Sequence, residues 1–534
     1  MTDDHGRSHL PSRPPLRLWP AGLLLAAATV ALAVVRLRDT TTFQQKNMTS
    51  MGILLGAFGL LLIWWTCFSR ARWRLRLGVT LGVLGVLGLG AGLFRVRGVS
   101  GDLVPILEPR WVKSERPVTA PPLGVGPVAP LPDPLSAAGI RPDFPQFLGP
   151  DRNAVLTGPA LDPDWTARPP RELWRNKIGP GWSGFAIVGG RALTQEQNGA
   201  SELVTCYDLL SGRPLWSHGD AARYDNPIGG EGPRATPTVV GDRVFTLGST
   251  GRLNALDLVT GRVQWTHDLV AETGAKVPEW GFAGAPLVLG GRVIVSAGGT
   301  ANQSLLAFRD DTGERVWAAG TAAAGYGSPF VATLGGRRQI LAYNHRHISA
   351  HDAADGAVLW EYPWGRGYPH VAVPVVVGPD RVVFSAGYGV GSELLEIKAA
   401  TDARRTAERV WQSLKLKAKF ANPVARDGFL YGLDDGMFVC LDLSDGAQKW
   451  KEGRYGHGQG LLVGDLFLLM AENGELVLLR PTPTGPNELH RFRVFSSKTW
   501  NPPALAGDLL IVRNDLEAVG LRLPLAAAAA TTVR

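Results

Sequence analysis

Short apolar runs separated by tight polar turns recur along the last two thirds of the chain. In residues 235–265, four such runs are separated by Gly-containing turns at 241–242, 250–251 and 260–261. Glycine supplies the positive φ that tight hairpins require. The pattern therefore predicts segments of four short antiparallel strands.

One phrase, an Asp followed by a Ser/Thr/Asp-Gly turn and a tryptophan, closes most of these segments. The closing positions are Trp174, Trp216, Trp265, Trp317, Trp360, Trp411, Trp450 and Phe492. Four-stranded units repeated at this spacing predict the blades of a β-propeller. We expect the tryptophan to lie on the outermost strand and to pack against the next blade, and the Asp and Ser/Thr to bond the turn backbone.

The number of segments predicts an all-β, eight-bladed β-propeller of four-stranded blades. Seven segments end at positions 216 to 492, and residues 503–523 offer three further strands without a fourth. The early strand Arg171–Ile178 has no blade of its own, so we expect it to complete the eighth blade. Closure of this kind removes free sheet edges. The predicted propeller occupies residues 143–524 and is followed by a flexible tail, 525–534.

Three apolar stretches precede the propeller, Leu16–Val35, Met48–Phe68 and Leu77–Phe94. Each is near the roughly 20 residues that cross a bilayer as a helix. They predict a membrane anchor at 16–98 with three transmembrane helices, preceded by a cytoplasmic tail, 1–15. A cleaved signal peptide is the alternative for the first stretch, but two further spans follow it and no Ala-x-Ala site ends it.

Loop charges predict the orientation. Arg70, Arg72, Arg74 and Arg76 crowd the loop between the second and third stretches, which the positive-inside rule places in the cytoplasm. An odd number of spans then predicts a multi-pass protein of the bacterial inner membrane with its propeller in the periplasm. The Pro-rich residues 99–142 predict an extended linker between the two parts.

Composition narrows the partners. The net charge is +8, but arginines near the membrane account for much of the excess, so nucleic-acid binding is not predicted. Cys206 and Cys440 occupy the same blade position, which predicts small core residues and no disulfide between them. Lys415, Lys417 and Lys419 alternate, which predicts one solvated face of a strand.

A candidate binding site follows from aligning the repeats, because residues that enter each innermost strand line the mouth of a propeller's channel. The aligned ring contains Trp182, Arg234, Tyr326, Phe420, His457 and Trp500. Beside it we expect Trp280 and His370, the carboxylates Glu231 and Glu279, and the amides Asn422 and Asn501. Aromatic faces with a few polar groups favour a planar or sugar-like ligand or a docked peptide. The alternative to ligand binding is that these aromatic residues only fill the channel mouth and close the core.

Catalytic signals are weak. The chain has no Gly-x-Ser-x-Gly elbow, phosphate-binding loop or His-Glu-x-x-His helix. His345, His347 and His351 cluster in sequence, and Glu231 with Glu279 could serve as an acid–base pair, but neither set predicts a site. We therefore predict no catalytic residue and no metal ligand.

The repeat phrase is similar to that of pyrroloquinoline quinone (PQQ) dehydrogenases and of BamB-like assembly factors. Phe144–Asn153 resembles the opening motif of bacterial PQQ-binding-like propellers, and the segments 232–237, 277–281 and 325–329 are also similar to that family. The resemblance covers residues 143–523 and implies the propeller fold without a single activity.

Two functions are compatible with the resemblance. We favour a membrane-anchored, non-catalytic binding or scaffold module for protein or envelope-assembly partners, with no cofactor. The alternative is a membrane-bound PQQ-dependent alcohol or sugar dehydrogenase, whose resemblance implies PQQ and a calcium ion held by Glu, Asn and Asp. No calcium triad can be matched residue by residue. The chain also lacks a Cys-Cys pair, and its short blades leave little loop length to cap a cofactor.

Overall fold

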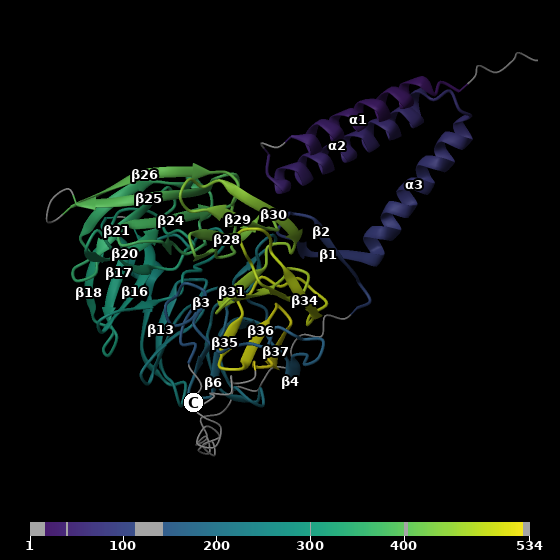
Figure 1. Ribbon diagram of the computed structural model, residues 1–534. Helices are drawn as coiled ribbons and strands as arrows, with labels where there is room; N and C mark the ends of the chain where they lie inside the picture. The colour runs from purple at the N-terminus through teal and green to yellow at the C-terminus, as the bar shows by residue number, and fades with distance from the viewer. Residues whose placement is uncertain (1–15, 39–40, 113–142, 300, 400–403, 527–534) are drawn as a thin grey trace, which may run out of the picture. The chain divides into compact units, whose positions relative to one another are not determined.

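The computed structural model describes residues 16–38, 41–112, 143–299, 301–399 and 404–526 (Figure 1). The predicted cytoplasmic tail, residues 113–142 of the predicted linker and the tail beyond 526 lie outside the described residues. Of the predicted tail, Leu525 still bridges to Leu161, and Ala526 N–H donates to the carbonyl of Ala160 at 3.0 Å.

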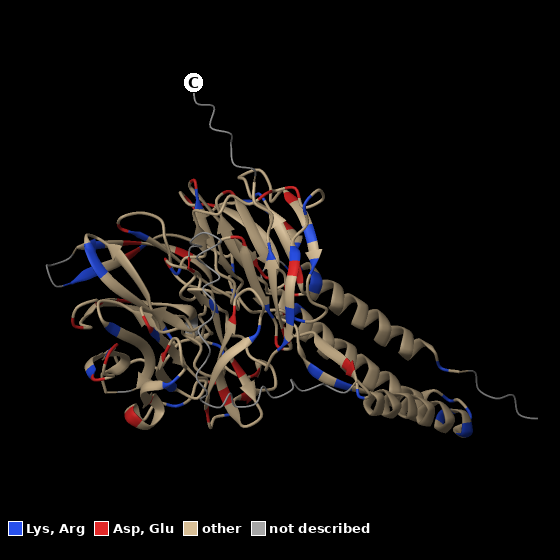
Figure 2. Cartoon of the chain, turned by 90° about the horizontal axis from the view of Figure 1, so that it is seen from below, with Lys and Arg blue, Asp and Glu red and all other residues tan. Residues whose placement is uncertain are grey.

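Three long apolar helices follow the amino terminus. They are α1 (Trp19–Leu37), α2 (Phe43–Ile63), which continues as the π-helical turn η1 (Trp64–Phe68), and α3 (Trp73–Leu93). All three are long and apolar enough to cross a membrane, which confirms the prediction, and their charged residues lie near their ends (Figure 2). α2 begins five residues before the predicted stretch because Thr42 and Gln45 form a capping box at its polar start.

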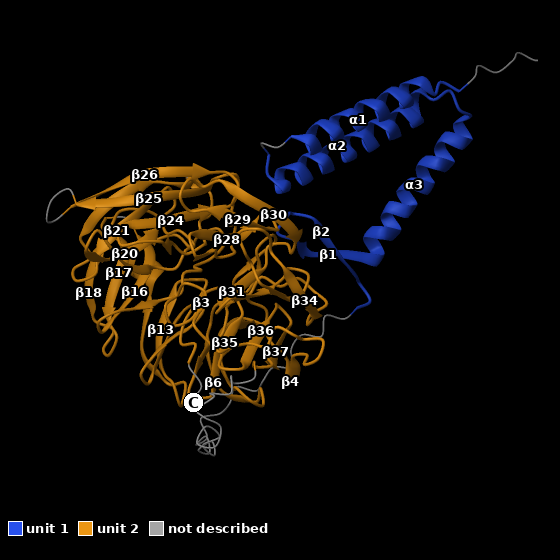
Figure 3. Ribbon diagram, viewed as in Figure 1, with its two compact units in different colours: residues 1–114 blue, residues 115–534 orange. Residues whose placement is uncertain are grey.

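A short hairpin follows α3, where the sequence predicted the end of the anchor and the start of an extended linker. Strands β1 (Phe94–Val99) and β2 (Pro105–Pro109) pair antiparallel, and Arg95 forms an ion pair of 2.7 Å with Glu108 across them. Both prolines lie at the ends of β2, where the lost N–H costs no ladder hydrogen bond. The helices and hairpin belong to one compact unit, residues 1–114, and the propeller to a second, 115–534 (Figure 3).

The second unit contains eight four-stranded antiparallel blades, as predicted. Blade 1 consists of β5 (Ala186–Val188), β6 (Arg191–Asn198), β7 (Ser201–Asp208) and β8 (Pro214–Asp220). Blade 2 consists of β11 (Thr238–Val240), β12 (Arg243–Leu247), β13 (Arg252–Asp257) and β14 (Val263–Asp268). Blade 3 consists of β15 (Leu287–Val288), β16 (Arg292–Gly299), β17 (Gln303–Arg309) and β18 (Arg315–Ala319). Blade 4 consists of β19 (Phe330–Leu334), β20 (Arg337–Tyr343), β21 (His347–Asp352) and β22 (Val358–Pro363).

The remaining blades repeat this plan. Blade 5 consists of β23 (Val375–Val376), β24 (Arg381–Ala386), β25 (Gly391–Ala399) and β26 (Arg405–Ser413). Blade 6 consists of β27 (Val424–Arg426), β28 (Phe429–Asp434), β29 (Met437–Asp442) and β30 (Gln448–Arg454). Blade 7 consists of β31 (Gln459–Val463), β32 (Leu466–Met470), β33 (Glu475–Leu479) and β34 (Glu488–Arg493). Blade 8 combines β35 (Ala504–Ala506), β36 (Leu509–Arg513) and β37 (Glu517–Arg522) with the early strand β4 (Arg171–Lys177).

Strand β4 closes the ring as predicted. It pairs antiparallel with β37, and Trp174 lies opposite Gly520. The last blade is therefore built from both ends of the propeller's sequence, so neither end leaves an unpaired strand of its own.

The repeat phrase forms the contact between neighbouring blades. Asp257 Oδ1 accepts hydrogen bonds from the backbone and the hydroxyl of Thr260 at 2.7 and 2.6 Å, which fixes the turn. Gly261 follows with φ +71°, and a Cβ there would overlap the indole of Trp216 from the preceding blade. That indole donates to the carbonyl of Leu258 at 3.0 Å. The glycine is thus needed both for the conformation of the turn and for the packing of the tryptophan.

Residues 144–156 lie against the inner strands of three blades. Phe144 pairs with Ile187 of β5, Val239 of β11 donates to the carbonyl of Pro145 at 2.8 Å, and β3 (Val155–Leu156) adds a parallel strand to β31. These contacts lie further along the inner strands than the residues that open those strands. The opening motif therefore contacts the inner strands beyond the residues of the predicted mouth.

Other chain segments carry small elements. The loop after blade 1 contains the short strands β9 (Asp225–Asn226) and β10 (Gly230–Glu231), the loop after blade 2 contains α4 (Leu269–Thr273), and the loop after blade 4 contains the turn η2 (Gly365–Gly367). Cys206 and Cys440 are buried in blades 1 and 6, which confirms that they are core residues.

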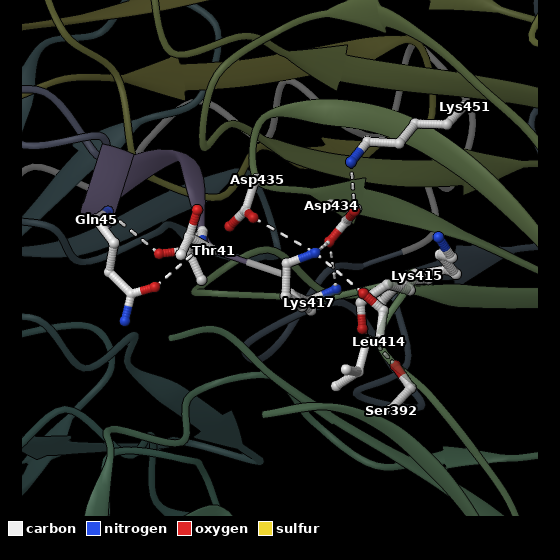
Figure 4. A network of polar contacts seen from close by, with 12 residues as sticks. Thr41, Gln45, Ser392, Leu414, Lys415, Lys417, Asp434, Asp435 and Lys451 are labelled. Atoms are coloured by element: carbon white, nitrogen blue, oxygen red, sulfur yellow. Dashed lines mark hydrogen bonds and ion pairs between the residues drawn. The ribbon is translucent and has the colours of Figure 1, made fainter. Parts of the chain in front are cut away.

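The prediction of a solvated lysine strand at 415–419 is wrong. These residues form no strand. Lys417 Nζ lies 2.5 Å from Asp434 Oδ1, and Lys451 Nζ lies 2.5 Å from the other oxygen of the same buried carboxylate (Figure 4). Lys419 is buried and only Lys415 is exposed. Alternation in sequence gave no information here, because the segment is a loop whose lysines find separate partners.

Candidate functional site

The mouth of the channel is formed by the loops that lead from the outer strand of each blade to the inner strand of the next. Every member of the predicted ring lies in such a loop, shortly before an inner strand: Trp182 before β5, Arg234 before β11, Tyr326 before β19, Phe420 before β27, His457 before β31 and Trp500 before β35. The repeat alignment thus placed all six at corresponding points of six blades.

Four ring members from consecutive blades are in contact. The ring centroids of Trp182 and Trp500 lie 4.9 Å apart, those of Phe420 and Trp500 5.0 Å apart, and those of Phe420 and His457 5.4 Å apart. The two tryptophans and the phenylalanine are half-buried, whereas His457 is buried. Blades 6, 7, 8 and 1 therefore present one continuous aromatic surface at the mouth.

Lysines that the sequence alignment missed cover parts of this surface. Lys498 Nζ lies 3.7 Å from the ring centroid of Trp500 and 4.9 Å from that of Trp182. Lys419 Nζ lies 5.8 Å from the ring centroid of Phe420 and 4.9 Å from that of Tyr388, which is outside this surface. These are distances at which a cation is attracted to an aromatic face. Each lysine lies within two residues of a ring member, and this proximity in sequence was the signal that could have identified them.

Arg234 is a further cation at the mouth. Its guanidinium lies 4.6 Å above the ring of Tyr224 and donates to the carbonyls of Gly229, Gly230 and Gly232. Burial lowers its pKa to about 10. Because the guanidinium already donates to three loop carbonyls, Arg234 holds the 229–232 loop and has fewer donors left for a ligand than the sequence suggested.

The loop that Arg234 holds also supports the aromatic surface. Trp182 Nε1 donates to the carbonyl of Gly229 at 2.6 Å, and a Cβ on Gly230 would contact the same indole. Glu231, at the end of this loop, forms an ion pair of 2.5 Å with Arg223. Glu231 is therefore engaged with a neighbouring arginine on its own loop.

Tyr326, Glu279 and Trp280 form the side of the mouth at blades 3 and 4. The backbone carbonyl of Glu279 accepts hydrogen bonds from the hydroxyl of Tyr224 and from Asn226, while its side chain is exposed and that of Trp280 is half-buried. Burial raises the pKa of Tyr326 to about 12, and the nearby Glu279 adds to the rise. Tyr326 is thus a neutral hydrogen-bonding group beside an exposed carboxylate.

The two predicted amides are buried within the framework. Asn422 accepts from Val373 N–H at 2.9 Å and donates to Gln459 at 3.2 Å. Asn501 donates to the carbonyls of Gly181 and Ser183 at 3.0 and 2.9 Å. Both side chains join the segments that lead into the inner strands of neighbouring blades, so they hold those blades together.

His370 is buried in the segment that joins blades 4 and 5. It is 1 % exposed, its ring packs edge-on against Tyr343 and Trp364, and burial lowers its pKa to about 4. The imidazole is therefore neutral and packed away from the aromatic surface.

The described residues contain no group of three or more His, Cys, Asp or Glu side chains arranged to hold a metal ion. At the mouth, Glu472 accepts from Trp500 Nε1 and from the backbone N–H of His457, both at 2.9 Å. In blade 4, His351 Nε2 and Ser349 Oγ are hydrogen-bonded at 2.8 Å, and His347 lies 3.3 Å from Glu361. The carboxylate and the two histidines therefore have protein partners.

Sequence and fold comparisons give consistent results. A family model described as outer membrane protein assembly factor BamB matches residues 170–277 and 200–452. A quinohemoprotein alcohol dehydrogenase from Comamonas testosteroni shares the fold with a TM-score of 0.51 and 12 % identity, over 74 % of this chain and 82 % of its own. BamB from Moraxella catarrhalis gives a TM-score of 0.47 and 16 % identity, over 66 % of this chain and 100 % of its own. Comparison with curated proteins gives no match.

Proposed function

Because the chain belongs to the BamB-like family of PQQ-type repeat propellers, we propose that it is a membrane-anchored, non-catalytic propeller that binds a protein partner of the bacterial cell envelope at its channel mouth. The helices α1, α2 and α3 support the anchor. The arginines of the loop between α2 and α3 support a cytoplasmic position for that loop and a periplasmic one for the propeller.

One observation carries this proposal, the continuous surface of Trp182, Trp500 and Phe420 with Lys498 and Lys419 over its aromatic faces. Half-exposed tryptophans resemble the centre of protein interfaces, where tryptophan, tyrosine and arginine side chains contribute most of the binding energy. The surface is built on loops that inter-blade hydrogen bonds hold in place. A partner would therefore meet a preorganised site and lose little affinity to ordering.

A photo-crosslinking experiment in the native membrane tests the proposal. A photoreactive amino acid at Trp182 or Phe420 should give the same crosslinked partner from both positions, and one at Val259, an exposed residue on the turn at the far end of blade 2, should not. In purified components, Lys498→Ala should weaken binding of that partner about tenfold. Lys449→Ala, an exposed lysine near the start of β30 and outside the mouth loops, is the matched control. Equal loss in both variants, or no partner shared by the two mouth positions, would contradict the proposal.

The quinoprotein alternative requires a fit between the mouth and PQQ with calcium, and the existing partners of three carboxylates near the mouth argue against it. A calcium ion needs several carboxylate or carbonyl oxygens converging on one point. Glu472 is occupied by Trp500 and His457, Glu231 by Arg223, and Glu202 by the backbone of Ser249. A separate test adds PQQ and Ca²⁺ to the protein and then desalts it. On the scaffold proposal, PQQ absorbance should not remain with the protein. Retained PQQ together with chelator-sensitive dye reduction would replace the scaffold proposal with a dehydrogenase.

A further inference from the structure

A cavity of about 710 Å³ lies between blades 4 and 5, apart from the aromatic surface. Its walls include Trp364 and Gly365 from the loop after β22, Gly389 and Val390 from the loop between β24 and β25, and Arg409 and Gln412 from β26. The two loops follow an outer strand or join the two middle strands of a blade, so the cavity opens at the mouth end of the propeller. Its volume suits a small molecule or a few peptide residues.

Three charged side chains line this cavity, Arg346, Arg409 and Glu393. Glu393 is buried, and its Oε2 accepts a hydrogen bond of 2.6 Å from the hydroxyl of Tyr362. Arg409 lies 3.5 Å from Glu393 Oε1 and donates to Gln412 at 3.3 Å. With one carboxylate and two guanidinium groups, the lining carries one excess positive charge.

Arg346 is the group that gives the excess. Its side chain is exposed and has no carboxylate within ion-pair distance among the described residues. Its backbone is fixed, because Trp364 N–H donates to its carbonyl at 3.0 Å. A guanidinium presents paired donors that match the two oxygens of a carboxylate. Burial raises the pKa of Tyr362 to about 12, so Tyr362 keeps its proton and keeps Glu393 bonded within the wall.

We propose that this cavity binds a carboxylate-bearing ligand, with Arg346 and Arg409 as the groups that bind the carboxylate and Trp364, Val390 and the glycines as its walls. The carboxylate belongs either to a free small acid or to the end of a peptide chain, and the same two arginines would bind both. This site is distinct from the aromatic surface and does not rest on the function proposed for it.

Calorimetric titration of the full-length protein in detergent tests the site. The probes are succinate and an acetylated tetrapeptide, Ala-Ala-Ala-Phe, with either a free or an amidated carboxyl terminus. The free acid should bind more tightly than the amide, because only the acid pairs with the arginines. Arg346→Ala and Arg409→Ala should each weaken acid binding about tenfold. Tight binding of succinate would identify a small acid as the ligand class, and binding of the peptide acid alone would identify a chain terminus.

Two controls make the result specific. Arg315→Ala removes an exposed arginine of β18 in blade 3 and should leave binding unchanged. Glu393→Gln should tighten acid binding, because it removes the negative charge of the wall while its amide oxygen can still accept from Tyr362. Equal binding of acid and amide, no effect of Arg346→Ala, or no binding of any carboxylate probe would overturn the proposal.

Discussion

The indole Nε1 of Trp174 donates a hydrogen bond of 3.0 Å to the carbonyl oxygen of Leu209. Trp174 belongs to β4, which completes blade 8, and Leu209 follows the third strand of blade 1. The bond therefore joins the last blade to the first, through the same contact that joins Trp216 to Leu258 one blade later. Closure of the propeller uses the ordinary contact between blades.

Trp174→Ala should lower the free energy of unfolding by about 3–5 kcal/mol, the usual cost of removing a large buried aromatic side chain. The side chain is 8 % exposed, and its removal also deletes the hydrogen bond that joins blade 8 to blade 1. Chemical denaturation of the purified protein measures the change. Trp280→Ala, at a half-buried mouth position, is the control and should cost much less. Equal effects would mean that closure contributes no special stability.

Gly261→Ala should destabilise the propeller more than Gly241→Ala. Both glycines have a positive φ, +71° and +61°, so both substitutions carry the backbone penalty of about 1 kcal/mol. Only at Gly261 would the new Cβ also overlap Trp216, whereas nothing lies within 4 Å of it at Gly241. The difference in thermal stability between the two variants separates the packing effect at Trp216 from the backbone effect of the turn. Equal losses would contradict a packing role for the repeat glycine.

Asp434→Asn should lower stability by about 2–4 kcal/mol, because it leaves Lys417 and Lys451 without the carboxylate that both contact. The Asp434 side chain is 2 % exposed, and those of Lys417 and Lys451 are 13 % and 26 % exposed. Asp427→Asn is the matched control, since that carboxylate is 79 % exposed beside Arg426 and should contribute little. Denaturant titration compares the two variants. If Asp434→Asn were as stable as Asp427→Asn, the network would not contribute to stability.

Glu202 should make the propeller less stable as the pH rises from about 4.5 to about 7. Burial raises the pKa of its carboxyl from 4.5 to about 7, so the folded state favours the protonated form. The contribution of Glu202 to the free energy of unfolding is therefore highest below about pH 4.5 and falls, by at most about 3 kcal/mol, until about pH 7. Asp220 and Arg234 are the charged groups that act on this carboxyl. Glu202→Gln removes the titration, so the difference in stability between wild type and variant should change across this range. A constant difference would show that Glu202 does not titrate there.

Reporter fusions test the orientation inferred from the arginines at 70–76. A reporter that is active only in the periplasm should work when fused after Pro122 and should be silent when fused near Arg72. A cytoplasm-dependent reporter at the same two sites is the control and should give the opposite pattern. Periplasmic activity at Arg72 would reverse the proposed topology.

The amino-acid sequence by itself determined the repeating architecture. The spacing of Trp216, Trp265 and their equivalents, with a glycine turn between strands, specified four-stranded blades because turn and strand chemistry are local. The same spacing assigned β4 to the eighth blade and placed the ring residues at corresponding points of their blades. The three apolar helices were equally readable, since length and composition decide whether a helix can cross a membrane.

Only the tertiary structure decided which polar side chains are available to bind a ligand. Asn422, Asn501 and His370 share the sequence neighbourhood of the mouth, yet their side chains are buried and bond or pack within the framework. Lys498 covers Trp500 although no repeat position marks it, and Arg346 meets Arg409 across a cavity between two blades. Such contacts join residues distant in sequence, and a repeat pattern fixes positions within a blade but not the partners that face them from the next.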